Sequence, residues 1–232
     1  MSAIPLPERP ASEPAAAVAG CTLKLVYWGP GLSGKTTNVK WLHARLRPEL
    51  RGRLVSLDTP GERTIFFDCL PLELEAAGGT VSLRLYTVPG QPRFRTTRRL
   101  VLRGLDALVF VWDLRSRRRL ENVRSLLEAR ESIEACGRNW DRLPRVIQLN
   151  KSDLFPQTAR EEVTAILDYL GERGPRIEAA AVDGRGVQAT LSAAARGALA
   201  RRLGISGPLA GDGAGDRSVA GQGSGAAAGS GV

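Results

Sequence analysis

A glycine-rich stretch near the start of the chain has the spacing G-x-x-x-x-G-K-[ST], which is typical of loops that bind phosphate groups. Without Cβ atoms at its glycines, such a loop can turn backbone N–H groups towards phosphate oxygens. The lysine is expected to reach the β- and γ-phosphates, and the following hydroxyl to bind Mg²⁺. The loop is Gly29-Pro30-Gly31-Leu32-Ser33-Gly34-Lys35-Thr36, followed by Thr37. A chance glycine-rich turn is the alternative, but the apolar run before the loop and the helical pattern after it favour a phosphate site.

A second motif, Asn150-Lys151-Ser152-Asp153, directly follows another apolar run. A carboxylate at Asp153 offers two acceptors to the neighbouring donors of guanine, N1–H and the 2-amino group, whereas adenine lacks the 2-amino donor. A site whose buried acceptor would stay unpaired rejects the wrong base strongly. Asn150 is expected to hold the loop and touch the base edge, and the stem of Lys151 to lie over the ring. The two motifs together predict a guanine nucleotide site and disfavour the alternative, an ATP-dependent enzyme that acts on a small molecule.

Between the two motifs, Thr87-Val88-Pro89-Gly90-Gln91 occupies the place where GTPases carry D-x-x-G-Q. The N–H of Gly90 is expected to face the γ-phosphate, and Gln91 to orient the attacking water. Thr87 replaces the aspartate that usually holds Mg²⁺ through water. That role therefore passes to a hydroxyl, to another carboxylate such as Asp58 or Asp68, or is lost. A Gln91 that is only a surface turn residue is the alternative.

Apolar runs and helical patterns alternate along the chain and must position these motifs. The run at 107–112 is nearly all apolar, as expected of a central strand buried on both faces. The alternation predicts an α/β fold, a three-layer P-loop NTPase with a mostly parallel central sheet and helices on both faces. The predicted strands are 23–28, 53–57, 64–72, 81–88, 107–112 and 145–149, with 64–72 and 81–88 able to pair across residues 78–79. The predicted helices are 36–47, 117–135, 158–170 and 187–203.

Composition sets the outer bounds. Pro/Ala-rich and Gly/Ala/Ser-rich ends predict disordered tails at 1–20 and 206–232 around one folded domain at 21–205. No run of about 18 apolar residues indicates a membrane span, and no signal peptide is visible, so a cytoplasmic location is expected. The net charge of +9 has two readings. It predicts a basic surface for nucleic acid, anionic lipid or an acidic partner, or arginines spread over solvated faces.

Longer strings in the sequence resemble one family, the MglA-type GTPases of bacterial gliding motility and polarity, which are members of the Ras superfamily. The resemblance covers about residues 21–203 and implies a Ras-like G domain. Threonine in place of the aspartate, at Thr87, looks like a trait of that family. The strings are Gly29-Pro30-Gly31-Leu32, Gly34-Lys35-Thr36-Thr37-Asn38, Arg63-Thr64, Phe66-Phe67-Asp68, Leu70-Pro71-Leu72 and residues 85–91, with Ala181 near Gly184 and Gly186.

The resemblance also implies roles for single residues. Thr64 matches the threonine that meets Mg²⁺ and the γ-phosphate in the GTP state, so the implied metal ligands are Thr36 and Thr64. Arg63 matches a built-in arginine that supports Gln91 in catalysis, with an exposed salt-bridge former as the alternative. Ala181 matches the small residue whose N–H meets the base oxygen.

For the protein as a whole, the resemblance implies a GTP/GDP switch that hydrolyses GTP slowly and acts at a cell pole. Its GTP form binds polarity or motility effectors, and a roadblock/LC7-type, MglB-like activating protein turns it off. These partners are expected at two switch regions, 58–67 and 87–103. No specific nucleic acid partner and no transmembrane segment are predicted, and the chain alone is expected to be a monomer.

Three features depart from the ordinary pattern. Pro92 follows Gln91 and restricts the backbone of the catalytic loop, and Thr87 weakens the metal shell. These two residues keep a second function open, a nucleotide-gated scaffold that binds GTP with little or no hydrolysis. Asp113, directly after the strand at 107–112, is expected to form a cap or turn rather than to catalyse. The second switch region is unusually basic, which indicates either an acidic partner or a solvated basic helix. Its arginines are Arg93, Arg95, Arg98 and Arg99.

Overall fold

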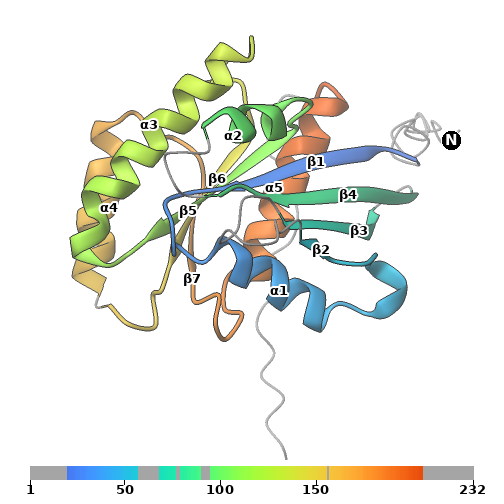
Figure 1. Ribbon diagram of the computed structural model, residues 1–232, viewed down its shortest axis with the longest axis horizontal. Coiled ribbons are helices and arrows are strands. Elements are labelled where there is room, and N and C mark those ends of the chain that lie inside the picture. Colours follow the sequence, from blue (N-terminus) through green and yellow to red (C-terminus); the bar gives the residue numbers. More distant parts are fainter. Residues whose placement is uncertain (1–19, 57–67, 77–78, 90–94, 156, 206–232) are drawn as a thin grey trace, which may run out of the picture.

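The computed structural model describes residues 20–56, 68–76, 79–89, 95–155 and 157–205, which form a seven-stranded sheet flanked by helices (Figure 1). The strand order is β2-β3-β4-β1-β5-β6-β7. From β4 to β7 the neighbouring strands are parallel, whereas β3 is antiparallel to β4 and β2 is antiparallel to β3. The strands are β1 (Thr22–Trp28), β2 (Val55–Ser56), β3 (Asp68–Ala76), β4 (Gly79–Thr87), β5 (Ala107–Asp113), β6 (Arg145–Asn150) and β7 (Arg176–Ala179).

Helices cover both faces of the sheet, and each face has its own hydrophobic cluster (Figure 1). α1 and α5 pack on one face, and α2, α3 and α4 pack on the other. Side chains of β1 alternate between the faces, so Leu25 belongs to the first cluster and Val26 to the second. The helices are α1 (Lys35–Arg45), α2 (Arg95–Leu102), α3 (Arg119–Ala135), α4 (Gln157–Tyr169) and α5 (Val187–Arg202).

This architecture confirms the predicted fold class and most of the predicted elements. The predicted hairpin is also confirmed, because β3 and β4 are paired as far as Ala76 and Gly79. The sequence did not predict β7, and it offered a helix in the basic second switch region, where α2 lies, only as one of two readings. β2 begins at Val55, two residues later than the predicted strand at 53–57, whose last residue lies outside the described ranges. The predicted tails, 1–20 and 206–232, lie outside the described residues except for Gly20, so the domain division stays a prediction.

The interpretation of the second switch region as a solvated basic helix is wrong at Arg98. Its side chain is only 2% exposed, and Nη2 lies 2.6 Å from Oε1 of Glu128 on α3. The guanidinium also lies over the ring of Trp28, 5.1 Å from its centroid. Arg98 therefore anchors α2 to the core and cannot belong to a basic docking surface. Arg93 and the side chain of Arg95 lie outside the described residues.

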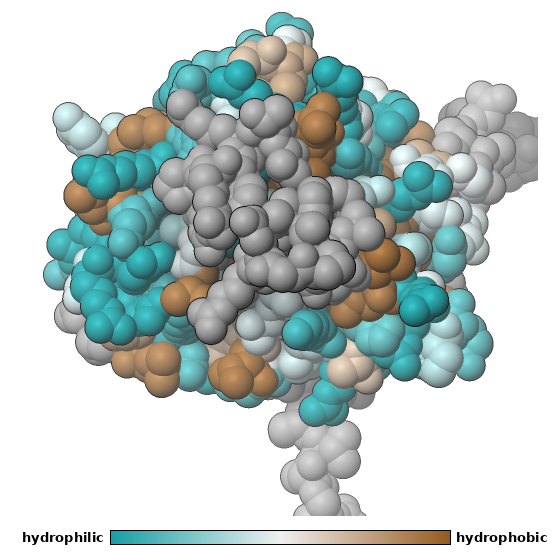
Figure 2. All heavy atoms as spheres, viewed as in Figure 1, coloured by the Kyte–Doolittle hydropathy of each residue, from teal (hydrophilic) through white to brown (hydrophobic). Residues whose placement is uncertain are grey.

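The described surface is of mixed character. On the face shown in Figure 2, the visible hydrophobic residues (brown) are scattered among hydrophilic ones (teal). Within the described ranges, no helix is both long enough and apolar enough to cross a membrane.

Candidate functional site

The phosphate loop connects the end of β1 to the start of α1, at the edge where the parallel strands end (Figure 1). Two of its positions require glycine. A Cβ at Gly29, where φ is 147°, would lie 2.4 Å from the carbonyl oxygen of Val111 on β5. A Cβ at Gly34, where φ is 104°, would lie 2.2 Å from Nδ2 of Asn150. The neighbouring strands thus approach the loop too closely for a side chain at either position.

Lys35 is the buried cation of the loop, with 7% of its surface exposed. Its Nζ donates hydrogen bonds to the carbonyl oxygens of Gly29 (2.8 Å) and Pro30 (2.7 Å). Burial, and then the charges of two nearby arginines, lower the pKa of Lys35 to about 7, although Asp68 acts in the opposite direction. An ammonium in such surroundings gains strongly from an anionic ligand, because the ligand supplies the missing counter-charge.

The second motif holds the phosphate loop from the side. Asn150 donates from Nδ2 to the carbonyl of Ser33 (2.7 Å), and its Oδ1 accepts the N–H of Ala181 (2.9 Å). Lys151 donates from Nζ to the carbonyl of Leu32 (2.8 Å). Asn150 therefore links the phosphate loop to the loop after β7. The Ala181 N–H implied for the base oxygen is directed to Asn150 in this structure.

A cavity of about 580 Å³ lies between the two motifs, within the range of about 300–1,000 Å³ that is common for ligand sites. Residues predicted to contact the phosphates and residues predicted to contact the base both line this cavity. Three of its residues are largely exposed apolar side chains that a flat base can contact: Leu32, Leu154 and Val182. The other lining residues are Gly34, Lys35, Thr36, Thr37, Asn150, Lys151, Asp153 and Ala181.

Asp113, at the end of β5, has a role beyond the predicted turn. The turn is present, because its Oδ1 accepts the N–H of Arg115 (3.1 Å). Its Oδ2 accepts hydrogen bonds from Nζ of Lys151 (2.8 Å) and Nη2 of Arg115 (2.6 Å). Burial alone would raise the pKa of Asp113, but the hydrogen bonds from Arg115 and Lys151 hold it below its ordinary value. The Asp113 carboxylate thus fixes the ammonium that Lys151 extends to the phosphate loop.

A buried polar network supports both loops, and the sequence did not predict it. Gln148 donates from Nε2 to Oδ1 of Asn38 (2.8 Å) and to Oγ1 of Thr190 (3.0 Å). Asn38 in turn donates to the carbonyl of Gly34 (2.9 Å), and Thr190 to that of Gly186 (2.6 Å). All three side chains are fully buried. The available signal was a glutamine in a strand that is otherwise mostly apolar.

Thr87 ends β4, where the D-x-x-G-Q pattern has aspartate. Its hydroxyl donates to Oδ2 of Asp68 (2.9 Å) and accepts the N–H of the same residue (3.0 Å). The sequence suggested two carboxylates for the metal's water shell. One of them, Asp68, lies beside the end of β4, and its negative charge raises the pKa of Lys35. The other, Asp58, lies outside the described residues.

The residues predicted for hydrolysis are not among those that the structure describes. Gln91 and Arg63 lie outside the described ranges, and so do Thr64 and Gly90. The structure thus brings together the predicted phosphate and base contacts, including Thr36 of the implied metal pair. The catalytic assignments stay predictions.

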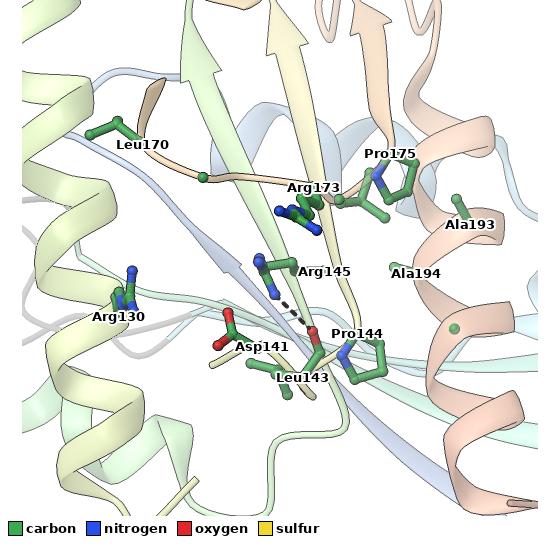
Figure 3. Close-up of a pocket in the computed structure, with 14 residues that line it drawn as sticks. Arg130, Asp141, Leu143, Pro144, Arg145, Leu170, Arg173, Pro175, Ala193 and Ala194 are labelled. Carbon is green, nitrogen blue, oxygen red and sulfur yellow. Dashed lines mark hydrogen bonds between the residues drawn. The ribbon is translucent and has the colours of Figure 1, made fainter. Parts of the chain in front are cut away.

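A larger cavity, of about 740 Å³, lies near the opposite edge of the sheet, beside the start of β6 (Figure 3). Its buried cation, Arg145, is already neutralised, because Nε lies 2.7 Å from Oε2 of Glu172. Oε1 of the same carboxylate accepts a hydrogen bond from Nε1 of Trp140 (2.8 Å). Most other lining residues are prolines, glycines, alanines, leucines and further arginines, and they offer no nucleophile paired with a base. The Trp140–Glu172–Arg145 cluster is therefore a buried ion pair that stabilises the fold rather than a candidate active site.

Glu172→Gln should destabilise the protein without weakening nucleotide binding. The change leaves the buried charge of Arg145 without its counter-ion, so the free energy of unfolding in urea should fall by about 3 kcal/mol. Glu134→Gln is the matched control, because Glu134 pairs with Arg130 at the surface (3.1 Å) and should cost less than about 1 kcal/mol. Equal losses in the two variants would contradict the structural role of Glu172.

Comparisons with known proteins identify the family. Residues 56–199 match the Ras family. The chain is 41% identical over 174 residues to the mutual gliding-motility protein MglA of Myxococcus xanthus (strain DK1622), covering 75% of this chain and 88% of that protein. It is 29% identical over 184 residues to the Ras-related protein Rab-9B of Mus musculus, covering 77% and 83%. It is 28% identical over 134 residues to the GTP-binding protein YPTM2 of Zea mays, covering 57% and 63%. The chain therefore belongs to the Ras family and, within it, to the MglA-type small GTPases.

Proposed function

We propose that this protein binds GTP and GDP with Mg²⁺, hydrolyses GTP, and acts as a molecular switch in bacterial cell polarity or gliding motility. One observation carries the nucleotide assignment: Asn150 bridges Ser33 of the phosphate loop and Ala181 of the loop after β7. Lys35 and Asp153 consequently line the same cavity. The motility role is taken from the name of the M. xanthus relative.

The residues around the loop fit a bound Mg²⁺ ion, which supplies charge neutralisation to the β- and γ-phosphates. Thr36 lines the cavity, and we propose that Thr64 joins it as a ligand in the GTP state. Asp68 is held by the hydroxyl of Thr87 (2.9 Å). This carboxylate is our candidate for the acceptor that orders the metal's water shell in place of the missing aspartate.

For hydrolysis, we propose that Gln91 orients the attacking water while Arg63 places positive charge beside the γ-phosphate. Gly90 presents its N–H to the same phosphate. A roadblock/LC7-type, MglB-like protein would accelerate the reaction by contacting the switch regions at 58–67 and 87–103. The protein would act in the cytoplasm at a cell pole and would be a monomer when alone.

Single-turnover hydrolysis tests the enzyme assignment. The full chain is loaded with GTP, and bound nucleotide is followed with and without a roadblock/LC7-type protein. We expect slow intrinsic turnover, on the order of 10⁻⁴ to 10⁻² s⁻¹, and a faster rate with the partner. Gln91→Leu and Arg63→Ala should each remove the stimulated rate while leaving GTP bound. Tight GTP binding without turnover in either condition would contradict hydrolysis.

That outcome would support the second candidate, a nucleotide-gated scaffold with little or no hydrolysis. One observation favours it: the Thr87 hydroxyl is hydrogen-bonded to Asp68. A neutral hydroxyl in that arrangement is a weaker partner for the metal's water shell than a free carboxylate. The same single-turnover experiment therefore separates the two candidates.

A further inference from the structure

We infer that Arg118 is a positioning residue of the phosphate site, which turns the peptide between Gly31 and Leu32 so that its N–H faces the bound phosphates. The inference rests on the proposed function, since it concerns how the same loop holds a nucleoside polyphosphate. Arg118 ends the short 3₁₀ turn Ser116–Arg118, directly before α3. It was not among the residues that the motifs predicted.

The contact itself is short. Nη2 of Arg118 donates to the carbonyl oxygen of Gly31 at 2.6 Å. In a planar trans peptide, the C=O of one residue and the N–H of the next point to opposite sides. A carbonyl held on the α3 side by Arg118 therefore leaves the N–H of Leu32 on the other side.

Arg118 completes a row of contacts along the loop. Lys151 holds the next carbonyl, that of Leu32 (2.8 Å), and Asn150 holds the one after it, that of Ser33 (2.7 Å). Three consecutive carbonyls are thus bound by side chains from two separate segments of the chain, the turn before α3 and the Asn150-Lys151 motif. Backbone N–H groups that gather on one side of a loop in this way form an anion-binding concavity.

The guanidinium is held in place before any ligand binds. Nη1 of Arg118 lies 2.9 Å from Oε1 of Glu121. Its backbone carbonyl accepts a hydrogen bond from Nδ2 of Asn122 (2.9 Å), whose Oδ1 accepts the N–H of Asp113 (2.9 Å). Asn122 is fully buried, whereas the Arg118 side chain is 22% exposed. The buried asparagine therefore ties the turn that carries Arg118 to the end of β5.

Arg118 also adds a permanent charge to the site. Its guanidinium contacts the carbonyl oxygen of Gly31 (2.6 Å), and the ammonium of Lys35 contacts that of the preceding residue, Pro30 (2.7 Å), so two positive charges border the same short loop and repel each other. A polyphosphate relieves this repulsion, and an arginine stays protonated throughout the working pH range. The contribution of Arg118 should therefore increase with the number of phosphates and should not depend on the base.

Affinity measurements across a nucleotide series test the inference. In Arg118→Ala, the affinity for GTP should fall roughly tenfold, as expected when a charge-assisted hydrogen bond is lost. The affinity for GDP should fall less, and that for GMP little. The ratio of GTP to ITP affinity should not change. Arg118→Lys retains the charge and should recover part of the GTP affinity, provided that thermal melting shows both variants to be folded.

Arg117→Ala is the matched control, because Arg117 lies in the same turn, is exposed and carries the same charge. Equal losses in Arg117→Ala and Arg118→Ala would overturn the inference, since long-range charge alone would then explain both. A loss in Arg118→Ala that is the same for GMP and GTP, or no loss at all, would overturn it as well. A wild-type protein that binds no guanine nucleotide would instead overturn the proposed function.

Discussion

Asp153→Asn should exchange the base that the protein prefers, from guanine to xanthine. The Asp153 carboxylate can accept both the N1–H and the 2-amino group of guanine, whereas an amide offers only one acceptor beside its donor. In xanthine the group at position 2 is a carbonyl oxygen, which the new amide can donate to. The affinity for GTP should fall at least about a hundredfold, because an unpaired polar group at the base is costly. The affinity for XTP should rise, and fluorescent nucleotide titration measures both.

Ser152→Ala is the control for this exchange. Ser152 lies in the same loop, and its contact with the carbonyl of Ala179 (3.0 Å) uses its backbone N–H, which alanine retains. Its nucleotide preference should therefore stay that of the wild type. If Asp153→Ala bound GTP as the wild type does, the guanine assignment would fail. If the wild type bound ATP tightly and Asp153→Ala still did, an ATP-dependent enzyme would become the better interpretation.

The elements that could be predicted are those with a strong pattern of their own. The nearly all-apolar run of β5 is typical of a buried central strand, and Lys35 closes a glycine pattern that favours a phosphate loop because a strand precedes it and a helix follows it. In contrast, β7 (Arg176–Ala179) is an edge strand with Ile177 as its one large apolar residue. α2 (Arg95–Leu102) is rich in arginine and short. Both are too short to be recognised alone, because a helical or strand period is reliable only over a longer run of residues.

The residues that hold the motif residues could not be predicted, because each depends on a partner far along the chain. Arg98 looks like a solvated cation until α3 places Glu128 beside it at 2.6 Å. Gln148 looks out of place in β6 until the fold brings Asn38 to within 2.8 Å. Burying such groups is unfavourable unless they are paired, so their presence in buried elements is a signal that a partner exists. It does not say which residue the partner is.

Lys35→Met should have two opposite effects, the first of which is the loss of tight nucleotide binding. The substitution removes the cation that lines the cavity and is expected to reach the β- and γ-phosphates. The affinity for GDP and GTP should fall at least about a hundredfold. Lys40→Met is the matched control, because Lys40 lies on the exposed side of the same helix. It should bind nucleotide like the wild type.

The second effect is that Lys35→Met should stabilise the nucleotide-free protein at neutral pH. The pKa of Lys35 is lowered from 10.5 to about 7, so the folded chain binds fewer protons than the unfolded chain within that window. The wild-type free energy of unfolding should therefore rise as the pH increases from about 7 to about 10, and below pH 7 the full cost of the buried charge is present. At about 1.4 kcal/mol per pKa unit this cost is at most about 5 kcal/mol. The Met variant also lacks the hydrogen bonds from Lys35 to the two loop carbonyls, and this loss offsets part of the gain, so a net gain of about 2 kcal/mol is expected at pH 7.

Urea unfolding at several pH values should show this gain in Lys35→Met together with a flatter pH dependence. A variant that is less stable than the wild type at pH 7 would mean that Lys35 is held by its loop and not merely tolerated until phosphate arrives.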